Sequence, residues 1–307
     1  MGSCFSENIG DKFREAKFCI DNNPFGIVYN PISIKNGILR MMEKKKYQID
    51  ELFEHDDIWY SFDHHSHFSG TGREDVLQNI NVRLLKSAEF LKSADLLFIT
   101  FGTSFIYELK TNRQVVSNCH KLPSGTFERR NVGVEEIYNE YSDLLEELYK
   151  YNPDLNVIFT VSPIRHWKDG AHGNQLSKAT LLLAIDKICN KYNQTLYFPS
   201  YEILLDDLRD YRFYNDDMLH PNITANNYIW QKVKDSFMES ETIVIMEEIV
   251  KIVQAVNHKP FNPKSDAFLA FANNFLDKIK LLKGKYNIDL AKEEKYFESF
   301  LFPPDSK

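Results

Sequence analysis

The 307-residue sequence is poor in cysteine and lacks long apolar runs. Its four cysteines form no C-x-x-C pair and no zinc-finger spacing, which excludes a disulfide framework and a structural zinc site. No stretch approaches the about 20 consecutive apolar residues of a transmembrane helix. The start of the chain shows no basic segment followed by an apolar one, so no secretory signal is visible. We therefore expect reduced thiols in a cytoplasmic protein.

The sequence also lacks an excess of positive charge. Lys and Arg number 37 against 44 Asp and Glu, which gives a net charge of −7 at pH 7. This balance offers no overall attraction to nucleic acid or to an anionic membrane. Internal repeats and low-complexity segments are absent as well. The pattern predicts neither a nucleic-acid partner nor a membrane span, and it leaves the oligomeric state open.

What is present is typical of a globular protein with a sizeable core. Hydrophobic residues make up 43% and charged residues 26% of the chain. The length allows one large domain, or one domain with an appendage. The 16 Tyr and 23 Phe suit either a thick core or a cleft that stacks on sugar rings, and composition alone leaves both open.

Apolar runs and helical periodicity alternate along most of the chain. DLLFITFG at 95–102 and NVIFTV at 156–161 are nearly continuous apolar runs, which is typical of strands buried on both faces of a parallel sheet. Amphipathic patterns predict helices between the strands. The helices are expected at 6–16, 31–46, 73–94, 134–150, 174–192 and, in segments, 223–255; further strands are expected at 17–20, 58–62 and near 195. The alternation predicts an α/β fold with a mainly parallel sheet.

The character of the chain changes near residue 257. NHKPFNPKSD is rich in Pro and Asn and is typical of a linker. Two polar helical patterns follow at 265–284 and 288–301. We expect a main domain over residues 1–256 and a linker with C-terminal helices over 257–307.

Asp217 and His220 are the best candidates for acid–base chemistry. A carboxylate on one imidazole nitrogen fixes the tautomer and frees the other nitrogen as a general base. The D-x-x-H spacing permits this contact when the intervening loop is tight. The alternative is a surface turn with two polar side chains.

The turn Gly2-Ser3-Cys4 offers two nucleophiles in front of a predicted helix. The positive end of a helix lowers the pKa of a thiol placed there. The alternative is that Ser3 or Ser6 serves only as the helix N-cap. From the first ten residues alone, the N-cap interpretation is preferred.

Further polar groups and glycines stand at expected strand ends or turns. Gly26 and Gly102 could offer an N–H to an oxyanion, or could serve only turn geometry. A metal site on the loop Asp63–His67 is a third possibility, but it lacks a second cluster at ligand spacing. The remaining candidates for substrate binding are Asn118, His120, Arg165 and His166.

In this order, the motifs resemble those of the GSCFA family within the SGNH/GDSL hydrolase superfamily. The resemblance spans about residues 2–240 and leaves the C-terminal 60 residues outside. Its most specific block is RDYRFYNDDMLHP at 209–221. The other blocks are GSCF at 2–5, YNP at 29–31, HSHF at 65–68, FGT at 101–103, NCHK at 118–121, SPIRH at 162–166 and NQLSKA at 174–179.

The resemblance implies a flavodoxin-like three-layer α/β/α sandwich and an esterase or acyl-hydrolase activity without a metal or other cofactor. His220 would be the general base and Asp217 its orienting carboxylate, with Gly26 and Gly102 at oxyanion or cleft positions. The frame of the superfamily's G-D-S places Cys4 at the nucleophile, whereas its usual serine chemistry favours Ser3.

The sequence departs from the superfamily in two further respects. The Asn of the G-x-N-D motif is absent, so an oxyanion donor would be missing or would be supplied by Thr103, Ser104, Asn30 or Asn118. The core strand that precedes the nucleophile turn in the family is missing, because only Met1 comes before Gly2.

We therefore expect a hydrolase that acts on a small-molecule or carbohydrate ester through a covalent acyl-enzyme. An acyltransferase, or a glycan-binding relative without catalysis, would use the same cleft. A metal-dependent hydrolase built on residues 63–67 is the third alternative.

Overall fold

The computed structural model describes residues 1–257, 260–286 and 288–301. Its internal contacts divide the chain into two units. Unit 1 comprises residues 1–10 and 21–231, and unit 2 comprises residues 11–20 and 232–307.

Unit 1 is built on a parallel sheet of the order β3-β7-β8. Its strands are β3 (Leu96–Phe101), β7 (Asn156–Val161) and β8 (Thr195–Phe198). Leu96 pairs with Asn156, and Val157 pairs with Thr195. The inner residues of β3 and β7 are almost fully buried, because helices and loops cover both faces. The prediction of a mixed α/β fold with two buried parallel strands is confirmed.

Helices connect and cover these strands. α4 packs on α2 and α5, and α5 packs on β7 and β8. The helices before residue 238 are α1 (Cys4–Glu15), α2 (Pro31–Met42), α3 (Arg73–Lys92), α4 (Val134–Tyr151), α5 (Gly170–Lys191), α6 (Ser200–Glu202) and α7 (Ile223–Phe237). The apolar stripe predicted for 73–94 is buried in α3 at Val76, Ile80 and Leu84. Its i, i+4 spacing places these side chains on one face.

Two small antiparallel sheets complete unit 1. β1 (Leu52–His55) and β2 (Ile58–Ser61) form a hairpin. β4 (Phe105–Leu109), β5 (Val115–Val116) and β6 (Phe127–Asn131) form a sheet of the order β5-β4-β6. This second sheet is inserted after β3.

The strand predicted at residues 17–20 is wrong. Lys17 has φ +63°, in the left-handed region that ends helices. The Phe18 N–H donates to the Phe13 carbonyl at 3.0 Å, and the two rings pack edge to face at 5.3 Å. The apolar residues after α1 therefore close the helix end instead of extending into a sheet.

Unit 2 contains α8 (Ser240–Asn257), α9 (Asp266–Lys285) and α10 (Ala291–Leu301). The helices predicted at 265–284 and 288–301 are thus confirmed. Ile252, Ile279 and Phe297 are fully buried in a shared core. Residues 11–20 join this unit through the ion pair between Lys17 Nζ and Glu293 Oε1, at 2.7 Å. α8 packs with these helices, although the sequence placed it in the main domain.

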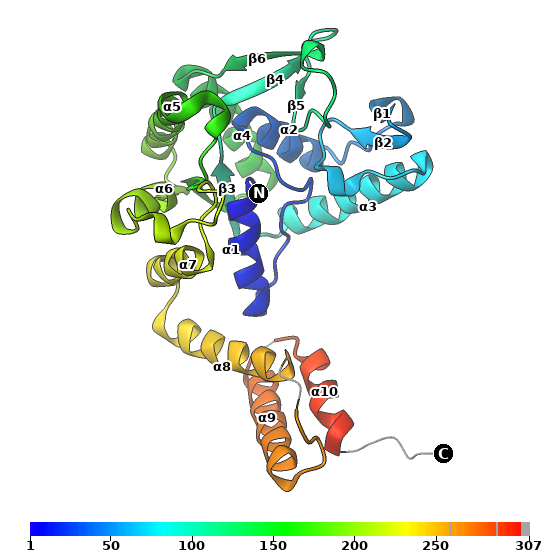
Figure 1. Cartoon of the computed structure of the whole chain (residues 1–307), viewed down its shortest axis with the longest axis vertical. Helices are drawn as coiled ribbons and strands as arrows, with labels where there is room; N and C mark the ends of the chain where they lie inside the picture. The colour runs from blue at the N-terminus through cyan, green and yellow to red at the C-terminus, as the bar shows by residue number, and fades with distance from the viewer. Residues whose placement is uncertain (258–259, 287, 302–307) are drawn as a thin grey trace. The chain divides into compact units, whose positions relative to one another are not determined.

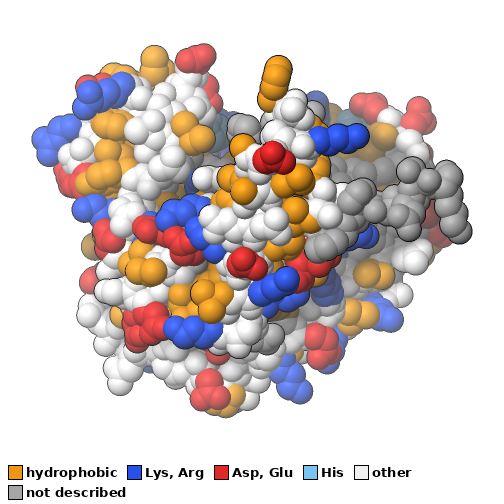
Figure 2. All heavy atoms as spheres, turned by 90° about the horizontal axis from the view of Figure 1, so that it is seen from below, with side chains coloured by type: hydrophobic (Ala, Val, Ile, Leu, Met, Phe, Trp, Pro, Cys, Tyr) orange, Lys and Arg blue, Asp and Glu red, His pale blue; other side chains and the backbone are white. Residues whose placement is uncertain are grey.

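Charges of both signs are mixed on the face drawn in Figure 2, where acidic and basic side chains lie between hydrophobic ones. That face has no broad area of a single charge. Among the described residues, no helix has the length and apolar character needed to cross a membrane.

Candidate active site

The parallel strands bring three chain segments to one edge of the sheet. β3 and β7 end at Phe101 and Val161, and the carboxyl ends of parallel strands share one edge. The N-terminus runs beside β3, since the Thr100 N–H donates to the Met1 carbonyl at 2.9 Å and Gly2 pairs with Thr100 in a parallel bridge. Figure 1 shows the N-terminus beside β3. The Gly2-Ser3-Cys4 turn therefore enters α1 at the edge where sites form in such sheets.

Gly2 is required by this close approach. It has φ +141°, and a Cβ there would lie 2.3 Å from the Thr100 carbonyl oxygen. Any side chain at this position would push the Gly2-Ser3-Cys4 turn away from β3.

Ser3 is enclosed within the protein. Its side chain is 0% exposed, and its Oγ donates to Ser162 Oγ at 3.0 Å. The same oxygen accepts from the Phe5 N–H at 3.3 Å, which is the contact of an N-cap residue. The N-cap role foreseen for Ser3 or Ser6 therefore falls to Ser3, which also links the N-terminal turn to the segment after β7.

Cys4 is the more accessible of the two candidate nucleophiles. It is the first residue of α1 and is partly exposed. Burial raises the pKa of its thiol, and a hydrogen bond with the Tyr29 side chain opposes that rise. The thiol therefore keeps its proton near neutral pH, and its attack on a carbonyl requires a base.

Asp217 and His220 form the predicted dyad. His220 Nδ1 and Asp217 Oδ2 lie 2.6 Å apart. Asp217 Oδ1 also accepts the N–H groups of Leu219 and His220, at 2.8 and 3.0 Å, and these bonds lower the pKa of Asp217 to about 2. Met218 between them has φ +58°, so the loop is tight. Since Asp217 holds Nδ1, Nε2 is the nitrogen that can receive a proton from a nucleophile.

The dyad is anchored to the segment that follows β7. The Arg165 N–H donates to the Leu219 carbonyl, and Arg165 Nη1 donates to the Met218 carbonyl, both at 3.3 Å. On the other side, the Asn215 N–H donates to the His220 carbonyl at 2.8 Å. His220 and Asp217 remain 41% and 44% exposed. Among the described residues, no hydrogen bond joins His220 to Ser3 or Cys4.

His166 lies in the same neighbourhood but differs in character. Burial, followed by the charge of Lys178, lowers the pKa of His166 to about 3, with His220 a weaker contributor. Its ring meets the Tyr29 ring edge to face at 5.5 Å. Its buried Nε2 has no hydrogen-bond partner among the described residues. His166 is therefore a neutral imidazole with one unused nitrogen.

The amides of the two candidate glycines are already bonded. The Gly26 N–H donates to the Asn23 carbonyl at 2.8 Å, and the Gly102 N–H donates to the Tyr29 carbonyl at 2.7 Å. Neither is free to receive an oxyanion. Gly102 instead permits a close approach, because a Cβ there would lie 3.0 Å from both His166 Nε2 and the Tyr29 carbonyl oxygen.

The other candidates for the missing oxyanion donor are also engaged. Asn30 caps α2, where its Oδ1 accepts the Ser33 N–H at 2.8 Å. The hydroxyls of Thr103 and Ser104 both bond Ser177 Oγ, at 3.1 and 3.0 Å. These side-chain hydrogen bonds therefore run to Ser33 and Ser177, and none of the three residues has one to Cys4 in the described part of the chain.

Asn118 and His120 belong to a different cluster. Asn118 Oδ1 accepts the His120 N–H at 2.9 Å, and His120 Nε2 contacts the Ser61 carbonyl at 2.8 Å. The His120 ring lies 4.6 Å from the Tyr60 ring. Their bonds run to the β1–β2 hairpin and its loop, rather than to the ends of the parallel strands.

The histidine-rich loop splits into a buried and an exposed part. His64 packs among the rings of Phe25, Tyr47 and Phe68, and burial lowers its pKa to about 3. The Nδ1 atoms of His65 and His67 lie 3.1 Å apart on the surface. No group of three or more His, Cys, Asp or Glu side chains in the described part of the chain is placed to share a metal ion.

Sequence reasoning missed Lys178. This side chain is 1% exposed, and its Nζ donates to the carbonyls of Gly102 and Ser162, both at 2.7 Å. Burial lowers the pKa of Lys178 to about 7. The lysine ties together the two turns that carry the site. Its motif, NQLSKA, was recognised, but a lysine in a helix is ordinarily exposed.

Tyr29 and Ser162 were also missed as individual residues, although YNP and SPIRH drew attention. Ser162 bonds Ser3 across 159 positions of sequence. Tyr29 contacts Cys4, His166 and the Gly102 amide. Only the alignment of the strand ends brings these residues together.

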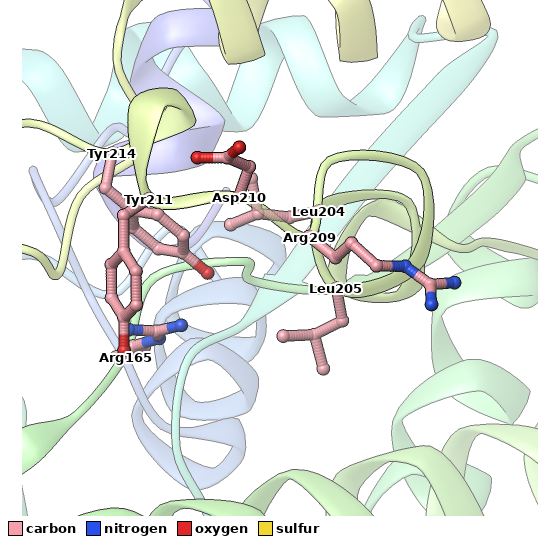
Figure 3. Close-up of a pocket in the computed structure, with 7 residues that line it drawn as sticks. All are labelled: Arg165, Leu204, Leu205, Arg209, Asp210, Tyr211 and Tyr214. Atoms are coloured by element: carbon pink, nitrogen blue, oxygen red, sulfur yellow. The ribbon is translucent and has the colours of Figure 1, made fainter.

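A pocket of about 180 Å³ is lined in part by Arg165, the residue that bonds the dyad loop. Arg165 and Tyr214 contribute both to this pocket and to the support of the loop, since Tyr214 pairs with Pro221 in a β-bridge. Figure 3 shows the Arg165, Tyr211 and Tyr214 side chains together on one side of the pocket.

Comparisons with known proteins agree on one family. The model described as GSCFA family matches residues 1–233. A second model, described as GSCFA domain protein, C-terminal domain, matches residues 249–301. Neither the curated proteins nor the solved structures searched contained a match to the chain.

Proposed function

Because this chain belongs to the GSCFA family, we propose that it is a hydrolase of the SGNH/GDSL type that cleaves ester bonds through a covalent acyl-enzyme. The observation that carries the proposal is that residues 162–165 hold both parts of the machinery. Ser162 bonds the nucleophile turn through Ser3, and Arg165 bonds the loop of the Asp217–His220 dyad. A nucleophile turn and an oriented imidazole on one support is the arrangement that acyl transfer requires.

The proposed fold is the flavodoxin-like three-layer sandwich of that superfamily. Its support is the parallel order β3-β7-β8 with helices between successive strands. In such sheets, ligands bind outside the carboxyl ends of the strands, which is where the N-terminal turn and the segment after β7 meet.

We assign the nucleophile to Cys4. A substrate carbonyl must reach the attacking atom, and Cys4 is partly exposed while Ser3 is 0% exposed and bonded to Ser162. The G-D-S frame of the superfamily leads to the same residue. Ser3 then acts as a positioning residue that fixes the turn.

The reaction follows from these positions. His220 Nε2 takes the proton from Cys4 Sγ as the sulfur attacks the ester carbonyl, and the protonated imidazole then gives that proton to the leaving alcohol. A thioester remains on Cys4. His220 next takes a proton from water, whose oxygen attacks the thioester, and the proton returns to sulfur as the carboxylic acid leaves. Asp217 holds the imidazole tautomer throughout.

The oxyanion donors are proposed to be the Cys4 N–H and the Tyr29 phenol. The Cys4 amide belongs to the first turn of α1, whose N–H groups have no partner within the helix. Burial, together with the neighbouring thiol, raises the pKa of Tyr29, so the phenol remains a donor. A phenol can fill this role in a water-poor site.

An acyltransferase is the second candidate. The exposure of Asp217 and His220 gives room for an acceptor larger than water, such as a sugar hydroxyl. A glycan-binding relative without catalysis would use the same surface. The acylated-carbohydrate substrate class is an extension from the superfamily and from the aromatic content of the chain.

The test is turnover of p-nitrophenyl acetate by the wild-type chain and by C4A, C4S, S3A and H220A. We expect C4A and H220A to lose turnover by at least 10³-fold, in the range seen for groups that act as a unit, while S3A keeps a measurable rate. Added alcohol acceptors separate transfer from hydrolysis, and a chelator should have no effect. Full activity of C4A with loss in S3A would reassign the nucleophile to Ser3.

A further inference from the structure

Arg165 is a cation without an acidic partner at the edge of the proposed site. Among the described residues, it makes no ion pair with Asp or Glu. Its guanidinium instead lies over the rings of Tyr214 and Tyr211, at 4.2 and 5.5 Å from their centroids. The planar guanidinium of arginine matches the geometry of a carboxylate or a phosphate. The structure therefore leaves this cation available to a ligand.

Apart from Arg165, the pocket is formed by residues from the segment 204–214. It is lined by Arg165, Leu204, Leu205, Arg209, Asp210, Tyr211 and Tyr214. In Figure 3 the Asp210 carboxylate and the Arg209 guanidinium lie away from the Arg165 guanidinium. Asp210 is occupied elsewhere, since its Oδ1 accepts the Arg212 N–H at 2.9 Å. The acid in the lining therefore does not neutralise Arg165.

The aromatic rings orient the guanidinium while leaving donors free. Cation–π contact fixes the plane of the group through its face. Of the five N–H donors of an arginine, Nη1 donates to the Met218 carbonyl at 3.3 Å, and the Tyr214 side chain is a further partner. The donors that remain suit the two oxygens of a carboxylate or a phosphate.

We propose that this Arg165 pocket binds an anionic group, a carboxylate or a phosphate, that the ester substrate carries. This inference rests on the proposed function. The pocket and the dyad loop share Arg165, which lines the pocket and bonds the carbonyls of Met218 and Leu219, between Asp217 and His220. A charged group held there lies beside the loop of the general base, so the preferred ester is acidic.

Matched esters test the proposal. 4-Acetoxybenzoate and its neutral amide place or omit a carboxylate on the alcohol side, and mono-p-nitrophenyl glutarate and its methyl ester do so on the acyl side. We expect wild-type kcat/KM to favour the anionic member of one pair. R165Q should lower that preference by about 10- to 100-fold, as expected for a charged hydrogen-bonded pair. Because Arg165 also supports the loop, R165Q can slow both members alike, and the ratio cancels that effect.

The matched control is R212Q. Arg212 is 74% exposed and lies outside the pocket lining, so its loss should leave the ratio unchanged. Added NaCl should lower the ratio in the wild type. An anionic preference that is absent, or that is the same in R165Q as in the wild type, would overturn the proposal.

Direct binding separates this proposal from the hydrolase assignment. Calorimetric titration with glutarate and with inorganic phosphate measures the affinity for each anion without turnover, and so distinguishes a carboxylate site from a phosphate site. Binding that R165Q weakens, in a protein that hydrolyses no ester, would retain the pocket and reject the hydrolase. Turnover of neutral esters without binding of either anion at millimolar concentration would retain the hydrolase and reject the pocket.

Discussion

At Cys4, accessibility and proton affinity act in opposite directions. In the proposed mechanism, a substrate reaches the sulfur because Cys4 is partly exposed, yet the residue is buried enough to raise the pKa of the thiol. Position at the start of α1 and the contact with Tyr29 favour the thiolate. The residue therefore depends on its neighbours, and the effect of each neighbour can be measured.

Tyr29→Phe removes only the phenolic hydroxyl and so measures its contribution. The ring contact with His166 and the bond from the Gly102 N–H to the Tyr29 carbonyl both survive. If the phenol donates to the oxyanion, kcat for ester acylation should fall by about 10²- to 10³-fold with little change in KM. The pH midpoint of Cys4 alkylation by iodoacetamide should also rise, because the Tyr29 contact lowers the pKa of the thiol.

Tyr149→Phe is the matched control. The buried Tyr149 hydroxyl has no hydrogen-bond partner among the described residues, and it lies outside the proposed site. A shift in the alkylation midpoint with unchanged acylation in Tyr29→Phe would restrict Tyr29 to tuning the thiol.

At the level of elements, the site is the product of strand alignment. β3 and β7 could be predicted from the sequence because a strand buried on both faces is a continuous apolar run, which is visible without knowing its partner strands. The Asp217–His220 dyad was readable because its members are three residues apart. Ser162 and Lys178 were not assigned, since their contacts arise only when residues far apart in sequence reach one edge of the sheet. Residues 17–20, which follow α1, were mistaken for a strand because their short apolar run is ambiguous.

Lys178 joins the ends of β3 and β7, because its Nζ donates to the carbonyls of Gly102 and Ser162. Its folded pKa of about 7 lies below the ordinary 10.5. Between these values the unfolded chain holds a proton that the folded chain has released, so stability rises with pH across this window. The free energy of unfolding of the wild type should therefore increase relative to that of K178M from pH 7.5 to 9.5.

Urea unfolding of both proteins at the two pH values measures this difference. Lys187→Met, which removes an exposed lysine paired with Glu135, is the control. Parallel pH dependence in the wild type and K178M would show that Lys178 does not titrate in this window.

At the scale of the whole molecule, the chain consists of two units with separate cores. Unit 1 carries every candidate site residue, and the family model over residues 1–233 covers the same region. The helices of unit 2 were readable from their periodicity. The inclusion of α8 and residues 11–20 in that unit was not, because it depends on contacts such as Lys17 with Glu293.

Acid should destabilise unit 1 through its buried histidines. The pKa values of His64 and His166 are lowered to about 3 from 6.5. As the pH falls from 6.5 toward 3, the unfolded chain takes up protons that the folded chain does not, so stability is lost in this window. Each histidine contributes a slope of at most about 1.4 kcal/mol per pH unit.

His64→Phe should flatten this loss, because phenylalanine fits among the rings of Phe25, Tyr47 and Phe68 and does not titrate. Urea unfolding at pH 7.5 and 5.0 measures the difference. Equal losses in the wild type and in His64→Phe would exclude His64 as a source of acid sensitivity.

The most direct test is to locate the acyl group that the protein carries during turnover. Rapid acid quenching of the wild type with p-nitrophenyl acetate, followed by peptide mass spectrometry, locates the acyl group. We predict an acetyl thioester on Cys4 that hydroxylamine removes, that C4A lacks, and that persists longer in H220A if it forms there at all. An acetyl ester on Ser3, or turnover without any acylated residue, would contradict the proposed mechanism.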